Sequence, residues 1–160
     1  MKHASLVAWA WIVAAGFTFA GAERSADDLK LETLFKEYLE AEFKFQPLYA
    51  TRSGDHRFDN KLDDISLAAR KAARERAAKW LADLPTKVDR QKLSRSSQID
   101  LEIWQDHLRR ELWWMDNTDP WANDPRIYND YITESVYSLF AQSTLPKGDN
   151  IRNAAERMVH

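Results

Sequence analysis

The sequence contains no cysteine and little glycine, and both shortages narrow the folds that it can adopt. Its 160 residues include 4 glycines, 5 prolines and no cysteine. The lack of cysteine excludes a disulfide framework and a lipid anchor on a cysteine, so apolar burial alone must hold the core. Few glycines beside many alanine, leucine, glutamate, lysine and arginine residues are typical of helices. The composition therefore predicts an all-α domain.

A strong charge of one sign is also missing, as are the common catalytic motifs. The formal net charge is −2, whereas a nucleic-acid-binding protein usually presents a basic face. We therefore expect no nucleic-acid partner. The sequence has no H-E-x-x-H, no glycine-rich phosphate loop and no G-x-S-x-G, so it offers no ready metallopeptidase, nucleotide or serine-hydrolase signature.

The longest apolar run lies close to the N-terminus. It covers residues 6–20, follows a short basic start and precedes small residues up to Ala22. The run is shorter than the ~20 residues that span a bilayer, which favours a cleaved secretory signal peptide of residues 1–22 over an uncleaved anchor. We predict that residues 23–160 are exported to the periplasm or the extracellular space. Membrane contact would occur only through the signal peptide before cleavage.

The remaining chain alternates amphipathic segments with turn signals and predicts four to five helices. Proline follows the first two segments closely, and Asp124-Pro125 has the form of a helix start. The expected helices lie at residues 26–45, 65–84, 94–115, 124–142 and from near Asn150 onward. The last has no stop signal before His160. We therefore expect a chain truncated within a longer, mostly helical protein.

The third expected helix, residues 94–115, has two apolar stripes. One includes Trp104 and Leu108, and the second lies on nearly the opposite side. The second stripe consists of Ile99, Ile103, Trp113 and Trp114. A helix that is apolar on two sides is usually buried on two sides. We predict that the second stripe is exposed in this chain because its covering lies elsewhere.

Residues 47–66 join the first two helices and combine charged with aromatic side chains, which is unusual for a linker. They include the basic Arg52, His56 and Arg57, the acidic Asp55, Asp59, Asp63 and Asp64, and the apolar Leu48, Tyr49 and Phe58. We expect an ordered loop that packs on both neighbouring helices, with Phe58 as its anchor. Gly54 should have a positive φ.

Glu42 interrupts the apolar stripe of the first helix. Either it reaches water near the helix end, or it is buried and forms an ion pair with Arg52 or Arg57, since an unpaired buried charge is too costly. The second helix, by contrast, is expected to present a solvated charged face. That face consists of Arg70, Lys71, Arg74, Glu75, Arg76 and Lys79.

The candidate metal ligands are few. His107 and Glu111 are four residues apart, so they share one side of a helix, but no third ligand accompanies them, and a surface pair is the simpler interpretation. His56 lies among acids and is more typical of a structural hydrogen bond than of a ligand. We therefore predict no catalytic residue, no metal site and no cofactor within this chain.

Several short pieces of the sequence together resemble one known family. They are Phe45-Gln46-Pro47-Leu48-Tyr49-Ala50-Thr51, Gly54-Asp55-His56-Arg57-Phe58-Asp59, Leu62-Asp63-Asp64-Ile65-Ser66, Leu84-Pro85, Leu93-Ser94, Ile99-Asp100, Asp124-Pro125-Arg126-Ile127-Tyr128, Ile151-Arg152 and Glu156-Arg157-Met158. Their order resembles the N-terminal part of the bacterial family known as domain of unknown function 885. The resemblance implies a longer, exported, mostly helical zinc metallopeptidase, whose H-E-x-x-P-G-H motif would lie downstream.

On this resemblance we interpret residues 23–160 as the N-terminal fragment of a zinc-dependent peptidase, inactive alone. Zinc would belong to the full-length protein, the rest of that protein would be the partner, and a peptide the substrate. The loop residues Asp55, His56, Arg57 and Asp59 would line or brace its cleft. The alternative is a small exported helical binding or chaperone-like protein, with Trp121 and the two-sided third helix as its partner surface.

Overall fold

The computed structural model describes residues 24–159, and within this range every regular element is helical. The predicted all-α fold is confirmed, with more helices than the four to five expected. In chain order they are α1 (Ala26–Phe45), α2 (Pro47–Arg52), η1 (His56–Phe58), α3 (Leu67–Lys87), η2 (Arg90–Lys92), α4 (Arg95–Asn117), α5 (Pro120–Asn123), α6 (Arg126–Ala141) and α7 (Lys147–Arg157). The predicted signal peptide lies outside the described residues and stays a prediction.

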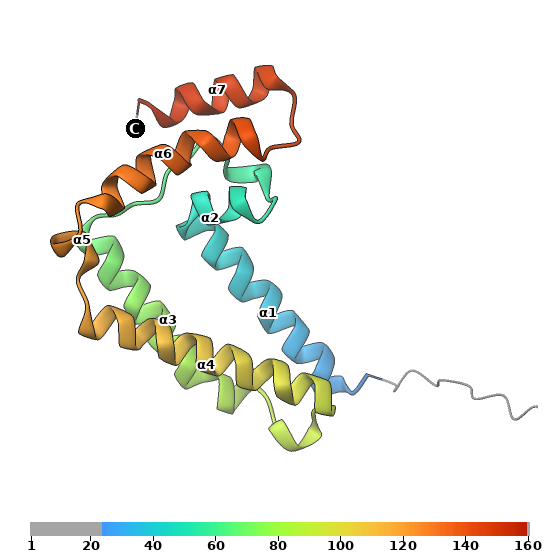
Figure 1. Ribbon diagram of the computed structural model, residues 1–160. Coiled ribbons are helices and arrows are strands. Elements are labelled where there is room, and N and C mark those ends of the chain that lie inside the picture. The colour runs from blue at the N-terminus through green and yellow to red at the C-terminus, as the bar shows by residue number, and fades with distance from the viewer. Residues whose placement is uncertain (1–23, 160) are drawn as a thin grey trace, which may run out of the picture.

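The helices form two groups (Figure 1). In the first, α1, α3 and α4 pack around one apolar core. Its buried members are Leu31, Leu34, Ala77, Leu84, Val88, Leu93, Leu101, Trp104 and Leu108. Burial of one such leucine contributes roughly 1.5–3 kcal/mol, so this cluster is the main source of stability.

Trp104 occupies the centre of that core. Its ring stacks on Phe35 at a centroid distance of 4.4 Å and also contacts Tyr38 and Trp80. The four aromatic residues come from all three helices. They fix how α1, α3 and α4 lie against one another.

The second group consists of α2, η1, α6 and α7. Figure 1 shows α6 and α7 side by side, with α2 close to α6. Ala50 of α2 and Leu139 of α6 are fully buried, and the short side chain of Ala50 permits the close approach. The short α5 connects α4 to α6 at the side of the molecule.

Hydrogen bonds between capping residues join the N-terminal end of α1 to the N-terminal end of α4. Ser25 and Asp28 form a capping box at the start of α1, which satisfies two helix-end donors. The second carboxylate oxygen of Asp28 accepts a hydrogen bond from the backbone N–H of Ser94 at 2.9 Å. Ser94 is itself the N-cap of α4. The starts of the two helices are therefore held together.

Three helix boundaries differ from the prediction. Pro47 does not lead into a loop but begins the short α2, because proline is well tolerated at the first helical position. Pro85 lies inside the last turn of α3, which continues to Lys87. The last helix begins at Lys147 and ends at Arg157, whereas we expected it to begin near Asn150 and to run on at His160.

The second apolar stripe of α4 is exposed, as predicted. Ile103, Trp113 and Trp114 are 60%, 58% and 59% exposed, so only the Trp104 side of this helix is buried within the described range. Trp121, expected to be exposed, is half-buried instead because its ring contacts Tyr128 and Tyr131 edge to face. Among residues 24–159, no helix is both long and apolar enough to cross a membrane.

Candidate functional site

The segment after α2 is shaped by a Schellman motif. The N–H of Gly54 donates to the carbonyl of Thr51, and the N–H of Asp55 donates to the carbonyl of Ala50. Gly54 has φ +86°, which confirms the predicted positive value, since this left-handed conformation closes the motif without a Cβ clash. The Asp55 side chain then accepts from the backbone N–H of Arg57 and caps η1.

Asp59 is the buried centre of this segment, with a relative exposure of 1%. Its Oδ1 accepts a hydrogen bond from the Thr51 hydroxyl at 2.8 Å, and its Oδ2 lies 2.8 Å from His56 Nδ1. Both carboxylate oxygens are therefore satisfied, as a buried charge requires. His56 has the structural hydrogen bond that its acidic surroundings predicted.

Arg157 of α7 completes the cluster from the far end of the chain. It is 2% exposed and donates to the Thr51 hydroxyl at 2.7 Å and to the carbonyl of Ser135. Burial lowers the pKa of its guanidinium, while the nearby Asp59, Tyr131 and Asp63 oppose that shift. One arginine thus ties α2, α6 and α7 together.

Asp63 and Tyr131 form a second link between this segment and α6. The Tyr131 hydroxyl accepts from the backbone N–H of Asp63 at 2.7 Å and donates to its carbonyl at 3.2 Å. The Asp63 carboxylate accepts from the N–H of Leu48 and so caps α2. Burial raises the pKa of Asp63 above its usual range and the pKa of Tyr131 to about 12.

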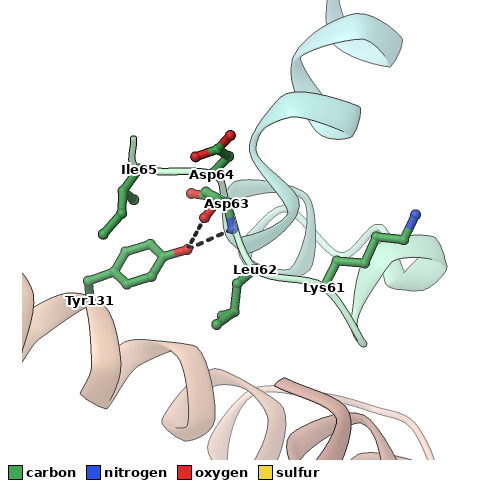
Figure 2. Close-up of a pocket in the computed structure, with 6 residues that line it drawn as sticks. All are labelled: Lys61, Leu62, Asp63, Asp64, Ile65 and Tyr131. Atoms are coloured by element: carbon green, nitrogen blue, oxygen red, sulfur yellow. Dashed lines mark hydrogen bonds between the residues drawn. The ribbon is translucent and has the colours of Figure 1, made fainter. Parts of the chain in front are cut away.

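Figure 2 shows the open hollow beside this link, with a volume of about 540 Å³. Its lining residues are Lys61, Leu62, Asp63, Asp64, Ile65 and Tyr131. Tyr131 points from α6 at the Asp63 backbone, and Lys61 extends away from it. The Tyr131 hydroxyl and the Asp63 carboxylate in this lining are both hydrogen-bonded to the protein backbone.

A second hollow of about 210 Å³ lies between α1, α2 and α4. We call it the Glu111 groove. Its lining residues are Tyr38, Leu39, Glu42, Gln46, Tyr49, His107 and Glu111. It combines carboxylates, phenol rings and an imidazole in one place.

Glu42 is buried and paired, but the expected partner was wrong. Its carboxylate binds Arg76 of α3, with Nε at 2.9 Å, and also accepts from Gln46 at 2.8 Å. Arg76, which we expected on a solvated face, lies over the ring of Phe45 at 3.7 Å. Because α3 and α1 share one apolar core, the Arg76 side chain reaches Glu42, whereas Arg57 pairs with Glu40.

The two arginines that were candidates for Glu42 lie elsewhere. Arg57 forms ion pairs with Asp55 and with Glu40 of α1, at 2.6 and 2.7 Å, and Arg52 is exposed. Phe58, the expected anchor, is only half-buried. The segment is held to α1, α6 and α7 rather than to α3, and Asp59 is the residue that anchors it.

His107 and Glu111 face each other on α4 at 3.8 Å. Burial, together with repulsion from Glu42, raises the pKa of Glu111. No group of three His, Cys, Asp or Glu side chains in the described part of the chain has the arrangement of a metal site. The residues present there do not fit a catalytic zinc, which needs about three protein ligands.

Four residues important to these clusters were not identified from the sequence. Arg76 was assigned to solvent, Arg157 was only part of a matching motif, and Thr51 and Tyr131 received no role. Each makes its key contact with a residue far away along the chain. Local sequence patterns do not carry these contacts, because each depends on how the helices pack.

The sequence matches the family described as "Bacterial protein of unknown function (DUF885)" over residues 47–160. The chain belongs to the DUF885 family. The match begins at the first residue of α2, so it contains the complete Thr51–Asp59–Arg157 cluster and leaves α1 outside. No curated protein and no solved structure matches the chain. Membership of the DUF885 family is therefore the starting point for a proposal about the function of this chain.

Proposed function

We propose that residues 23–160 are the N-terminal helical region of an exported zinc-dependent peptidase and are inactive alone. The observation that carries this proposal is the DUF885 match over residues 47–160, in a family that resembles zinc metallopeptidases. A zinc hydrolase needs about three protein ligands, an activated water and a nearby base. We assign these groups to the rest of the full-length protein, which would bind the peptide substrate.

The role that we propose for the α2–η1 segment is to brace the cleft of that protein. Asp55 and Arg57 hold it to α1 through Glu40, while His56 and Asp59 hold it to α2 and, through Thr51, to α7. Such a doubly held segment is suited to present a rigid surface to a neighbouring domain.

Activity measurements test the peptidase proposal directly. The purified chain should hydrolyse no peptide with or without added zinc. The product of the same reading frame extended past codon 160 should hydrolyse peptides and lose that activity to a chelator. Chelator-sensitive hydrolysis by the short chain, or a frame that ends without a zinc motif, would contradict the proposal.

The export part has its own test. N-terminal sequencing of the secreted protein should begin at Glu23, because small residues precede that position. Recovery of a chain that still begins at Met1 in a membrane fraction would contradict cleavage.

The second candidate is a small exported helical binding protein, and the exposed stripe of α4 favours it. Ile103, Trp113 and Trp114 leave more than half of each side chain in solvent, and apolar patches of this kind often bind partners. A genuine stop codon after His160, together with reversible capture of unfolded peptides by the short chain, would support this candidate over the first.

A further inference from the structure

The Glu111 groove has a feature that neither candidate function uses: within residues 24–159, one of its carboxylates has no cation at hydrogen-bond distance. Glu42 is already neutralised by Arg76 and by a hydrogen bond from Gln46. Glu111 keeps only 26% of its side chain exposed, and its nearest ionic neighbour is His107 at 3.8 Å, beyond hydrogen-bond distance.

Burial without a hydrogen-bond partner in the described part of the chain makes the Glu111 carboxylate a strong acceptor. A half-buried carboxylate loses part of its hydration, and a positive charge that binds beside it stabilises its ionised form. The raised pKa of Glu111, caused first by burial and then by Glu42, is consistent with this. Of the charged groups around it, Arg76 is committed to Glu42, and His107 lies at the rim with 52% of its side chain exposed.

The walls of the groove suit a flat cation. Tyr38 contributes a phenol from α1, and Tyr49, which is 48% exposed, contributes one from α2. Burial raises the pKa of Tyr38, and the nearby Glu42, Glu111 and Tyr49 add to that shift. The same four residues line one groove. Aromatic faces attract cations, and a guanidinium both stacks on them and bridges to a carboxylate.

We infer that the Glu111 groove binds the guanidinium group of an arginine side chain from a peptide or protein partner. Glu111 accepts its hydrogen bonds and the two tyrosines contact its plane, while Gln46, whose amide donates to Glu42, forms another part of the lining. The volume of about 210 Å³ admits one side chain and not a folded element. This inference does not depend on peptidase activity, since it concerns recognition by α1, α2 and α4 alone.

The test compares two probes of nearly the same shape, one with a charged guanidinium and one with a neutral ureido group. Nα-acetyl-arginine methylamide and the neutral Nα-acetyl-citrulline methylamide are titrated into the purified chain, and the amide and imidazole NMR signals of residues 38–49 and 107–111 are followed. We expect saturable shifts with arginine and binding of citrulline weaker by about tenfold or more, the equivalent of one charge-assisted contact.

Matched variants separate the groove from general charge. Glu111→Gln should weaken the arginine probe by about tenfold, whereas Asp106→Asn, which removes the same charge from an exposed position beside Arg110 on α4, should leave it almost unchanged. Equal binding of both probes, no saturable binding, or equal losses in both variants would each overturn the inference. If Glu111→Gln failed to fold, the two probes on the unaltered chain would still decide.

Discussion

The Glu42–Arg76 pair allows a quantitative test of how α1 and α3 are held together. The two side chains are 9% and 16% exposed and meet at 2.9 Å. Glu42→Ala leaves the guanidinium of Arg76 and the amide of Gln46 without their acceptor. Loss of one partner from a buried pair costs about 3–5 kcal/mol. In this variant the Arg76 guanidinium keeps its partial contact with solvent and its cation–π contact with the Phe45 ring. We therefore expect a destabilisation at the lower end of this range, about 3 kcal/mol.

Urea unfolding followed by circular dichroism measures this cost, and a double-mutant cycle isolates the pair. Glu42→Ala, Arg76→Ala and the double variant should give a coupling free energy of at least about 1.5 kcal/mol. The control is Glu40→Ala, two residues earlier on the same helix, whose partner Arg57 is exposed. It should cost far less. Equal losses at the two glutamates, or no coupling between Glu42 and Arg76, would refute the assignment of a buried pair.

Three further predictions concern the backbone, acid stability and the last helix. Gly54→Ala should destabilise the protein by about 1 kcal/mol because of the positive φ, whereas Gly148→Ala in α7 should be neutral or stabilising; thermal unfolding compares them. Hydrogen bonds from Ser97, Ser94 and Ser25 lower the pKa of Asp28 from its usual 3.8. The ionised carboxylate therefore stabilises the folded state at pH values above 3.8, and this stabilisation is lost as the pH falls through the lowered pKa. Asp28→Asn should therefore flatten the acid side of the urea-midpoint profile, and an unchanged slope would contradict this. Arg157→Met should speed hydrogen exchange in residues 54–59, whereas Arg152→Met at an exposed position should not.

The long helices could be predicted because their signals are local. Leu31 and Leu34 recur at helical spacing, Ser25 and Ser94 are typical N-caps, and Asp124-Pro125 precedes α6. The positive φ of Gly54 also follows from a local cause, the short turn after Thr51. Such features need only neighbours along the chain.

Features that depend on tertiary packing were predicted less well. The six residues of α2 are too few for a periodic pattern, and its cap, Asp63, lies 15 residues away. The place of Glu42 on an apolar stripe left burial as one of two alternatives, and the choice of Arg76 over Arg57 depends on where α3 packs. No local sequence pattern indicates where α3 packs against α1. The same reason hid the partnership of Thr51 with Arg157.

The contact between Arg157 and Thr51 also has a consequence for the order of folding. It closes a loop of 106 residues, and Asn60 meets Glu156 across 96. Closing such long loops costs conformational entropy, and this cost must be offset before the contacts can stabilise the fold. The α1, α3 and α4 core has shorter spans, so it can form before α7 packs. The α2–η1 segment would then remain loose until α7 is in place, and a partner that reached it earlier would find the buried carboxylate of Asp59 accessible.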